Sequence, residues 1–158
     1  MVKPITQYYD VIINAPFGGV GIHVESDYVV GIQLFPIQQN ARETSHQFAQ
    51  HIANKISQYF MQAGSILDIP YAVSGTPFQK RVWKAISDIP AGEVLTYSEL
   101  AEKVGSGPRA VANACGANRL PLLIPCHRVV AKNGLGGFMQ GIDGGLKIKE
   151  WLLAHESK

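Results

Sequence analysis

GTPFQKRVWKAISDIPAGEVLTYSELAEKVG, residues 75–105, carries two start signals for α-helices. Thr76 suits the N-cap, Pro77 the first helical position and Gln79 the third position of a capping box. The segment Thr96–Glu99 repeats the same arrangement. Apolar residues follow each start at helical spacing: Phe78, Val82 and Ile86, then Tyr97, Leu100, Ala101 and Val104. We therefore predict one helix that starts at residue 77 and ends at Pro90 or Gly92, and a second helix over 97–104.

A glycine turn, residues 105–107, precedes Pro108, which suits the start of a third helix that runs to about Gly116. Two short helices joined by such a turn form either a helix-turn-helix or an ordinary helical hairpin, and the pattern alone does not separate them. After Arg109 the third helix holds almost only small residues. This favours close docking on a DNA backbone or minor groove with Arg109 as the probe, or else tight packing in a core.

The first third of the chain has the period of β-strands. Val20, Ile22 and Val24, and then Val30, Ile32 and Leu34, alternate with other residues on either side of Ser26-Asp27, which predicts a hairpin with one buried face. A further strand is expected over 9–13 and a helix over 45–61, ended by Gly64. Residues 67–73 form a connector. We expect an α/β (α+β) fold with domains 1–73 and 74–158.

Composition points to a folded protein of the cytoplasm. Of the 158 residues, 46% are apolar, and neither a signal peptide nor a membrane-spanning run is present in the sequence. Cys115 and Cys126 are the only cysteines, so reduced thiols are expected, with no disulfide framework and no metal site. Residues 1–73 hold three basic and five acidic residues, and 74–158 hold eleven and seven. This basic excess is compatible with two interpretations: the second half binds a nucleic acid, or it has an ordinary solvated surface.

The stretch LPLLIPCHRVV, residues 120–130, places three polar residues inside an apolar run. Its two prolines argue against a helix, so we expect a buried, extended segment. Cys126 is either a core cysteine or a nucleophile, and the basic neighbours His127 and Arg128 favour the reactive thiolate. Because adjacent residues point apart, His127 is expected to act on Cys126 through a water molecule, with a carboxylate behind it. In cysteine proteases the catalytic histidine lies far from the cysteine in the sequence, so the adjacent Cys126-His127 pair does not match that class of enzyme.

These motifs resemble the O6-alkylguanine-DNA alkyltransferase family. The lead-in helices 75–105, the signature IPCHRVV and the ending GGLKIKEWLLAHE occur in the family's order. The resemblance implies an RNase H-like N-terminal domain and a winged-helix-like C-terminal domain with a helix-turn-helix. It also implies irreversible, single-use transfer of an alkyl group from guanine O6 in double-stranded DNA, with O4-alkylthymine as a further substrate candidate. The protein implied by the resemblance is a monomer that needs no cofactor. It binds the minor groove of DNA and does not bind a membrane.

The resemblance also assigns roles to residues. Cys126 falls on the alkyl acceptor, His127 on the histidine that acts through water, and Glu156 on the glutamate that orients it. Asn118 falls on the residue that links the helix-turn-helix to the cysteine turn. Among the expected substrate and DNA contacts, Tyr97 helps rotate the nucleotide and Arg109 fills the base stack. The backbone carbonyl of Val129 accepts a hydrogen bond from the guanine amine. The remaining expected contacts are Ser98, Cys115, Asp143 and Gly144.

This chain departs from the family pattern at three places. The turn before Arg109 is short, Arg119 stands where proline is more usual, and the loop 136–145 is a variant. Asp143 is expected to use only its backbone amide, and Phe138, Met139 and Ile142 are expected to form an adaptable apolar wall.

Three alternatives to this function differ in their chemistry. A lesion-binding relative without transfer would lack the cysteine. A regulatory alkylation sensor would need a further DNA-binding domain. A thiol hydrolase would turn over continuously.

Overall fold

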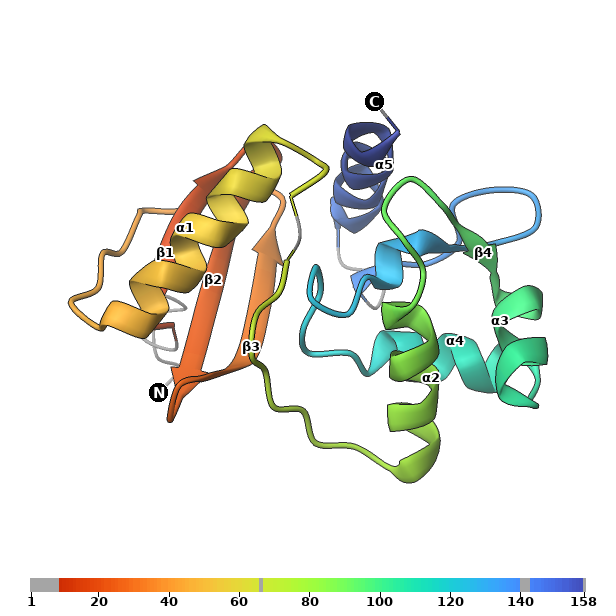
Figure 1. Cartoon of the computed structure of the whole chain (residues 1–158). Helices are drawn as coiled ribbons and strands as arrows, with labels where there is room; N and C mark the ends of the chain where they lie inside the picture. Colours follow the sequence, from red (N-terminus) through yellow and green to blue (C-terminus); the bar gives the residue numbers. More distant parts are fainter. Residues whose placement is uncertain (1–8, 66, 140–142, 158) are drawn as a thin grey trace. The chain divides into compact units, whose positions relative to one another are not determined.

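The computed structural model describes residues 9–65, 67–139 and 143–157 of the chain. The chain divides into two compact units, Met1–Val73 and Ser74–Lys158. Small sheets and five α-helices make up the described residues, so the protein has a mixed α/β fold (Figure 1).

The first unit is a three-stranded antiparallel sheet covered by one helix. Strands β1 (Val11–Ala15), β2 (Gly18–Glu25) and β3 (Tyr28–Phe35) pair in sequence order. Helix α1 (Gln47–Met61) lies along this sheet (Figure 1). It packs a buried stripe onto the sheet, because its apolar residues recur at helical spacing: Ala49, Ile52, Ala53, Ile56, Tyr59 and Phe60. These side chains and the buried face of the strands form the core of the unit.

The predicted hairpin is present, and its register contains one irregularity. Ser26 and Asp27 both have positive φ angles, 48° and 63°, as the tight turn between β2 and β3 requires. A bulge between His23 and Val24 then shifts the pairing, so that Val24 lies opposite Val29. The expected burial of Val30 is therefore wrong at this position. Val29 is fully buried and Val30 is half-buried, because a one-residue shift exchanges the two faces of a strand.

The second unit begins with the two helices that the capping signals predicted. They are α2 (Pro77–Ser87) and α3 (Tyr97–Val104), and both capping boxes have both of their hydrogen bonds. Helix α2 ends before Pro90, because Asp88 already serves as its C-cap. Between the helices, β4 (Leu95–Thr96) pairs in parallel with β5 (Val129–Val130).

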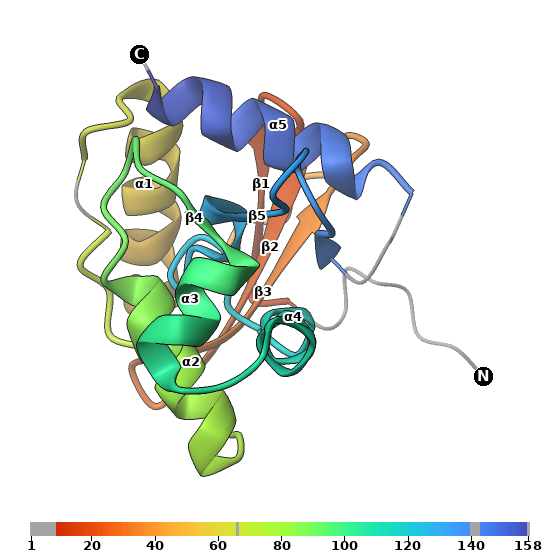
Figure 2. The ribbon, with the colours of Figure 1, turned by 90° about the vertical axis from the view of Figure 1, so that its right-hand side faces the viewer.

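Helix α4 (Pro108–Gly116) follows α3 after the predicted glycine turn (Figure 2). Gly105 ends α3 at φ 70°, a left-handed conformation that glycine adopts without strain. Trp83 of α2 donates its indole N–H to the Ala114 carbonyl of α4 at 2.8 Å. Val111 and Ala114 are buried, whereas Arg109, Ala110 and Asn113 are exposed. The small-residue helix therefore has one packed face and one open face.

The segment that precedes the signature is not extended, so the expectation for residues 120–130 is wrong in this respect. Residues 121–123 form a turn with Leu122 at φ 77°, and Cys126–Arg128 form the short 3-10 helix η2 before β5 starts. The side chain of Asn118 fixes this turn, since its oxygen accepts from the Leu120 amide and its nitrogen donates to the Ile124 carbonyl, both at 2.9 Å. The prolines exclude an α-helix, but this side chain decides the actual path.

Helix α5 (Gly145–Glu156) closes the second unit. Its N-cap is Gly144, which has φ 84°. Ile148, Lys149, Leu152 and Glu156 are buried, and they share one face because they recur at helical spacing. None of the helices within the described ranges is long and apolar enough to cross a membrane.

Candidate active site

Cys126 lies at the wall of a cavity of about 360 Å³ in the second unit. The volume falls in the range of small-molecule sites, roughly 300–1,000 Å³. The lining is mostly apolar, and it brings together residues from α3, α4, η2 and the loop before α5: Tyr97, Ala112, Cys115, Gly116, Asn118, Pro121, Cys126, Gly137, Phe138 and Met139. Four of the predicted site residues, Cys126, Asn118, Tyr97 and Cys115, therefore share one cavity.

The Cys126 thiol has three polar neighbours. The side-chain amide of Asn118 donates to Cys126 Sγ at 3.1 Å, and the Cys115 carbonyl accepts from this thiol at 3.7 Å. A hydrogen bond with the Cys115 thiol, together with burial, raises the pKa of Cys126 well above its usual value. The thiol is therefore protonated at neutral pH, so a nucleophilic role for Cys126 requires an acceptor for its proton.

The neighbouring thiol behaves in the opposite way. The hydrogen bond from Cys126 lowers the pKa of Cys115, with a further contribution from the positive charge of Lys149. Cys115 is also half-buried, whereas Cys126 is only 7% exposed. The two cysteines therefore differ both in access to solvent and in the protonation state that their surroundings favour.

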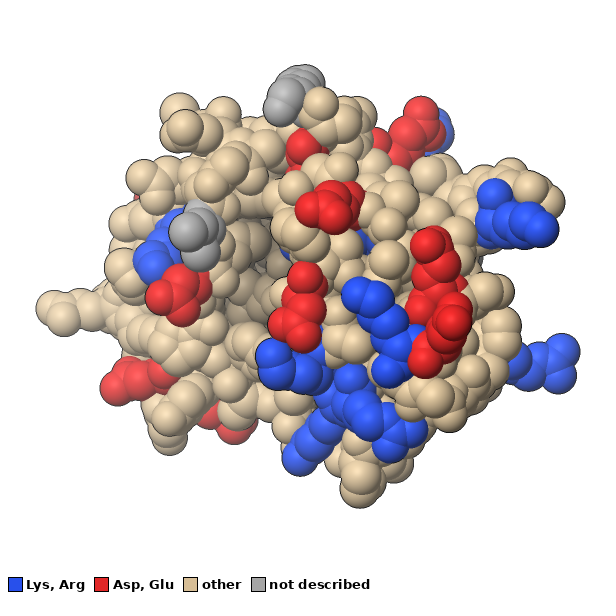
Figure 3. Space-filling view, turned by 45° about the vertical axis from the view of Figure 1, so that its right-hand side comes forward, with Lys and Arg blue, Asp and Glu red and all other residues tan. Residues whose placement is uncertain are grey.

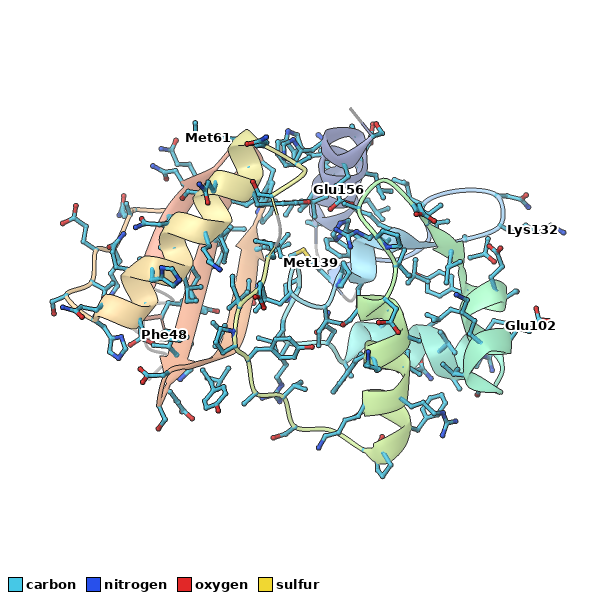
Figure 4. All side chains as sticks on the ribbon, in the orientation of Figure 1. Phe48, Met61, Glu102, Lys132, Met139 and Glu156 are labelled. Atoms are coloured by element: carbon cyan, nitrogen blue, oxygen red, sulfur yellow. The ribbon has the colours of Figure 1, made fainter. Side chains whose placement is uncertain are left out.

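A buried charged network lies behind the cysteine. Glu156 of α5 accepts from His127 Nε2 at 2.9 Å and from two nitrogens of Arg128 at 2.9 and 2.8 Å. A third nitrogen of Arg128 donates to the Ile89 carbonyl at 2.6 Å. The side chains of His127 and Glu156 are each 1% exposed. Figure 4 shows Glu156 projecting from α5 into the interior of the second unit. A buried carboxylate with this many donors remains ionised.

This network fixes the tautomer of His127. An ionised carboxylate only accepts hydrogen bonds, so Nε2 carries the proton and Nδ1 presents a lone pair. Burial lowers the pKa of His127 below its ordinary value, although Glu156 opposes the shift, so the ring is neutral at pH 7. Nδ1 is buried and has no hydrogen-bond partner within the described ranges. The described residues also show no direct bond between Cys126 and His127, in agreement with the expectation that adjacent side chains point apart.

Lys149 is a site residue that the sequence reasoning missed. Its side chain is fully buried, and Nζ donates to the carbonyls of Val129 at 2.6 Å and Gly137 at 2.9 Å. Burial lowers its pKa to about 8. A carbonyl oxygen has two lone pairs, so the bond from Lys149 alone does not exhaust the acceptor capacity of the Val129 carbonyl. Helical spacing offered a signal, since Lys149 shares the face of Leu152 and Glu156 while Lys147 does not.

Tyr97 lies against the loop at the mouth of the cavity. Its hydroxyl donates to the Gly137 carbonyl at 3.4 Å, and burial, followed by the nearby Cys115, raises its pKa. A Cβ on Gly136 would lie 2.8 Å from the Tyr97 ring, so this approach requires glycine. Lys149 also lies 5.9 Å from the ring centre of Tyr97 and 6.0 Å from that of Phe138. The loop is thus held from α3 and α5 at once.

The other predicted contact residues do not line the cavity. Ser98, Arg109 and Asp143 are exposed, and Gly144 is the N-cap of α5. Of the expected apolar wall, Phe138 and Met139 line the cavity, and Ile142 lies outside the described residues. Met139 is labelled in Figure 4.

Basic side chains gather on the surface of the second unit. Figure 3 shows lysine and arginine clustered over the part of this unit where α2 lies, with acidic side chains beside them. Helix α2 contributes the exposed Lys80, Arg81 and Lys84, of which Lys84 pairs with Asp88 at 3.1 Å. Within the described ranges, no three His, Cys, Asp or Glu side chains form a group that could hold a metal ion.

Comparison with known proteins identifies the class to which this fold and site belong. Residues 77–158 match the family described as "6-O-methylguanine DNA methyltransferase, DNA binding domain". The chain is 36% identical over 137 residues to a methylated-DNA–protein-cysteine methyltransferase of Metallosphaera sedula. The aligned residues make up 86% of this chain and 87% of that protein. The chain therefore belongs to the O6-methylguanine-DNA methyltransferase family.

Further relatives support this assignment. A methylated-DNA–protein-cysteine methyltransferase of Shigella flexneri is 45% identical over 108 residues, which are 66% of this chain and 61% of that protein. The chain thus matches less than two thirds of the length of that relative. Mycobacterium tuberculosis OGT in complex with DNA superposes with a TM-score of 0.75 at 29% identity, over 92% of this chain and 91% of that one. An O6-methylguanine DNA methyltransferase of Methanococcus jannaschii superposes with a TM-score of 0.65 at 31% identity, over 92% of each chain.

Proposed function

We propose that this protein repairs DNA by transferring the alkyl group of O6-alkylguanine irreversibly to Cys126. The observation that carries the proposal is the position of Cys126, with its thiol at the cavity wall and a buried His127–Glu156 pair behind it. Relatives named as methylated-DNA–protein-cysteine methyltransferases support the same reaction. O4-alkylthymine is a second candidate substrate, since it presents the same kind of alkyl–oxygen bond.

The transfer is a direct displacement. The sulfur of Cys126 attacks the alkyl carbon, the carbon–O6 bond breaks, and guanine leaves with the bonding electrons. The thiol proton passes through a water molecule to His127 Nδ1, which carries a lone pair because Nε2 donates its proton to Glu156 in a hydrogen bond. The proton then neutralises the guanine anion. Since a thioether has no good leaving group, each molecule acts once, and no cofactor takes part in the displacement.

Asn118 and Lys149 serve as positioning residues in this scheme. Asn118 holds the turn before η2 and donates to Cys126 Sγ, so it orients the sulfur and stabilises developing negative charge. Lys149 joins the Val129 and Gly137 carbonyls, and so fixes the two backbone segments between which the base enters. The second lone pair of the Val129 carbonyl accepts from the guanine amine.

The substrate nucleotide must leave the duplex to reach the cavity. We assign α3, the glycine turn and α4 to a helix-turn-helix that lies in the minor groove, where the small exposed face of α4 permits close approach. Arg109 is exposed on this face and takes the place of the extruded base, while Tyr97 at the cavity mouth guides the nucleotide. In this scheme the second unit is the winged-helix-like, alkyl-accepting domain and the first unit is RNase H-like. A relative solved in complex with DNA supports a DNA partner.

The direct test is the intact mass of the protein after incubation with a duplex that carries one O6-methylguanine. The proposal predicts a gain of one methylene group, located on the Cys126 peptide and absent from Cys126→Ser. Tight binding to the lesion without any gain in mass would instead identify a lesion-recognition protein.

A further inference from the structure

Both cysteines of the chain face the same cavity. Cys115 lies in the last turn of α4, and Cys126 is the first residue of η2. Each is a free thiol and each lines the cavity wall. The proposed alkyl transfer uses only Cys126 as a nucleophile, so the presence of a second thiol in the cavity has no role in that reaction.

The two cysteines are neighbours in space. Cys126 Sγ lies 3.7 Å from the Cys115 carbonyl oxygen, and each thiol affects the pKa of the other. Ten residues separate them in the sequence, and the intervening turn is held by Asn118. Formation of a disulfide requires the sulfurs to approach to about 2.05 Å. Because the Cys126 sulfur already lies against the backbone of Cys115, this approach needs only a local adjustment of side chains and of the last helical turn.

The surroundings divide the two roles that disulfide formation needs. The thiol that attacks an oxidant must be ionised and accessible, and the second thiol resolves the intermediate. Cys115 is the more exposed of the two, and its pKa is lowered by the hydrogen bond from Cys126, with the charge of Lys149 as a further cause. Cys126 is almost fully buried, which slows its direct oxidation.

We propose that Cys115 and Cys126 form a reversible disulfide in the presence of hydroperoxides, and that this bond masks the acceptor sulfur. The Cys115 thiolate attacks the peroxide, the O–O bond breaks, and Cys115 becomes a sulfenic acid while hydroxide or an alkoxide leaves. Cys126 then attacks the Cys115 sulfur. The S–S bond forms, the S–O bond breaks, and the released hydroxide takes the Cys126 proton to give water. The two sulfurs are oxidised, and the peroxide is reduced.

The disulfide has two consequences for the site. Cys126 accepts no alkyl group until a thiol reductant breaks the bond. The bond also prevents further oxidation of Cys126 to a sulfinic acid, which ordinary reductants do not reverse. Only the first consequence rests on the proposed role of Cys126 as alkyl acceptor.

The test treats the reduced full-length protein with stoichiometric hydrogen peroxide and measures its intact mass under non-reducing conditions. We expect the loss of two hydrogens, a cross-linked peptide that contains both cysteines, and a fall in alkyl transfer to lesion-bearing DNA of at least tenfold. Dithiothreitol should restore both the mass and the transfer. A gain of oxygen without the cross-link, or an unchanged mass, would overturn the proposal.

Cys115→Ser provides the matched variant, and it is compared only with its own untreated sample. With excess peroxide, Cys126 of this variant should slowly gain two oxygens as a sulfinic acid, and dithiothreitol should not restore the transfer that is lost. Full recovery of this variant would contradict the protective role of Cys115. The mass readout does not depend on alkyl transfer, so a cross-link in a protein that never accepts a methyl group would support the disulfide and refute the proposed function.

Discussion

The two sides of the short helix Cys126–Arg128 differ in almost every property. On one side the Cys126 thiol meets an open, mostly apolar cavity. On the other side His127, Arg128 and Glu156 form a buried network in which the carboxylate accepts three hydrogen bonds. The comparison teaches that the chemistry of the open side depends on electrostatics arranged behind it. A buried carboxylate is retained only with all of its partners, so this network tolerates change far less than the cavity wall does.

The largest effect is expected for Glu156→Gln. The amide no longer accepts three hydrogen bonds, and it leaves the charge of Arg128 uncompensated and the tautomer of His127 undefined. We expect the single-turnover rate to fall by about 100-fold or more. Urea unfolding should show a loss of about 3 kcal/mol. Glu102→Gln is the control, because Glu102 is exposed on α3 (Figure 4). A rate within twofold of wild type would contradict the claim that transfer at Cys126 depends on the buried network of His127, Arg128 and Glu156.

His127→Gln tests the same link through the pH dependence of the transfer rate. In the wild type, the rate should increase as His127 loses its proton at a pH below its usual pKa, and should then level off. Without this base, ionisation of Cys126 itself becomes limiting, and its pKa is raised well above the usual value. The rate of the variant should therefore be low at neutral pH and increase about tenfold per pH unit in the alkaline range. Identical profiles would exclude His127 as the proton acceptor.

Lys149→Met removes a buried cation that contacts the cavity loop. We expect about a tenfold slower transfer, since two carbonyls lose a donor, each at a cost of about 1–3 kcal/mol. Lys147→Met is the control, because Lys147 is exposed on the same helix.

Stability as a function of pH gives an independent test of Lys149. Its folded pKa of about 8 lies below that of an unfolded lysine, so between these values the unfolded chain binds more protons. The free energy of unfolding of the wild type should therefore increase, relative to Lys149→Met, as the pH increases through about 8. A constant difference between pH 7 and 10 would contradict the lowered pKa of Lys149.

Arg109→Ala should have a smaller effect, confined to DNA. The side chain is exposed, so the free energy of unfolding should change by no more than about 0.5 kcal/mol. Transfer from a duplex should slow several-fold, because nothing fills the base stack, while transfer from free O6-benzylguanine should be unchanged. Equal losses with both substrates would place Arg109 in the chemistry instead of in nucleotide extrusion.

Asp143→Ala should have the smallest effect. Asp143 is exposed beside the N-cap of α5, and we expect only its backbone amide to be used. The transfer rate should remain nearly unchanged in the single-turnover assay. A large change in either direction would show that the carboxylate itself acts near guanine O6.

Local signals in the sequence predicted much of the fold. Each of the capping boxes at Thr76 and Thr96 spans only four consecutive residues, so it can be recognised in the sequence alone. Both helices begin as predicted. The hairpin was predicted for the same reason. The burial of Val29 in place of Val30 was not predicted, because the bulge that shifts the register depends on the pairing with β2. The turn before Cys126 was also missed, since it depends on the side chain of Asn118.

The site was predicted unevenly for a related reason. Motif resemblance named Cys126, His127 and Glu156, which the structure brings together. It did not reveal that Lys149 joins two backbone segments, or that Cys126 Sγ lies against the backbone of Cys115. Such contacts join elements that are distant in the sequence, and only the folded packing defines them.

The most direct test of the central claim counts repaired lesions per protein molecule. The protein is mixed with an excess of duplex that carries O6-methylguanine, and the remaining lesions are measured until the reaction stops. Irreversible transfer to Cys126 predicts a plateau at one lesion per protein, and no repair by Cys126→Ser. Repair that continues beyond one equivalent, or that persists in the variant, would contradict the assignment of Cys126 as a single-use acceptor.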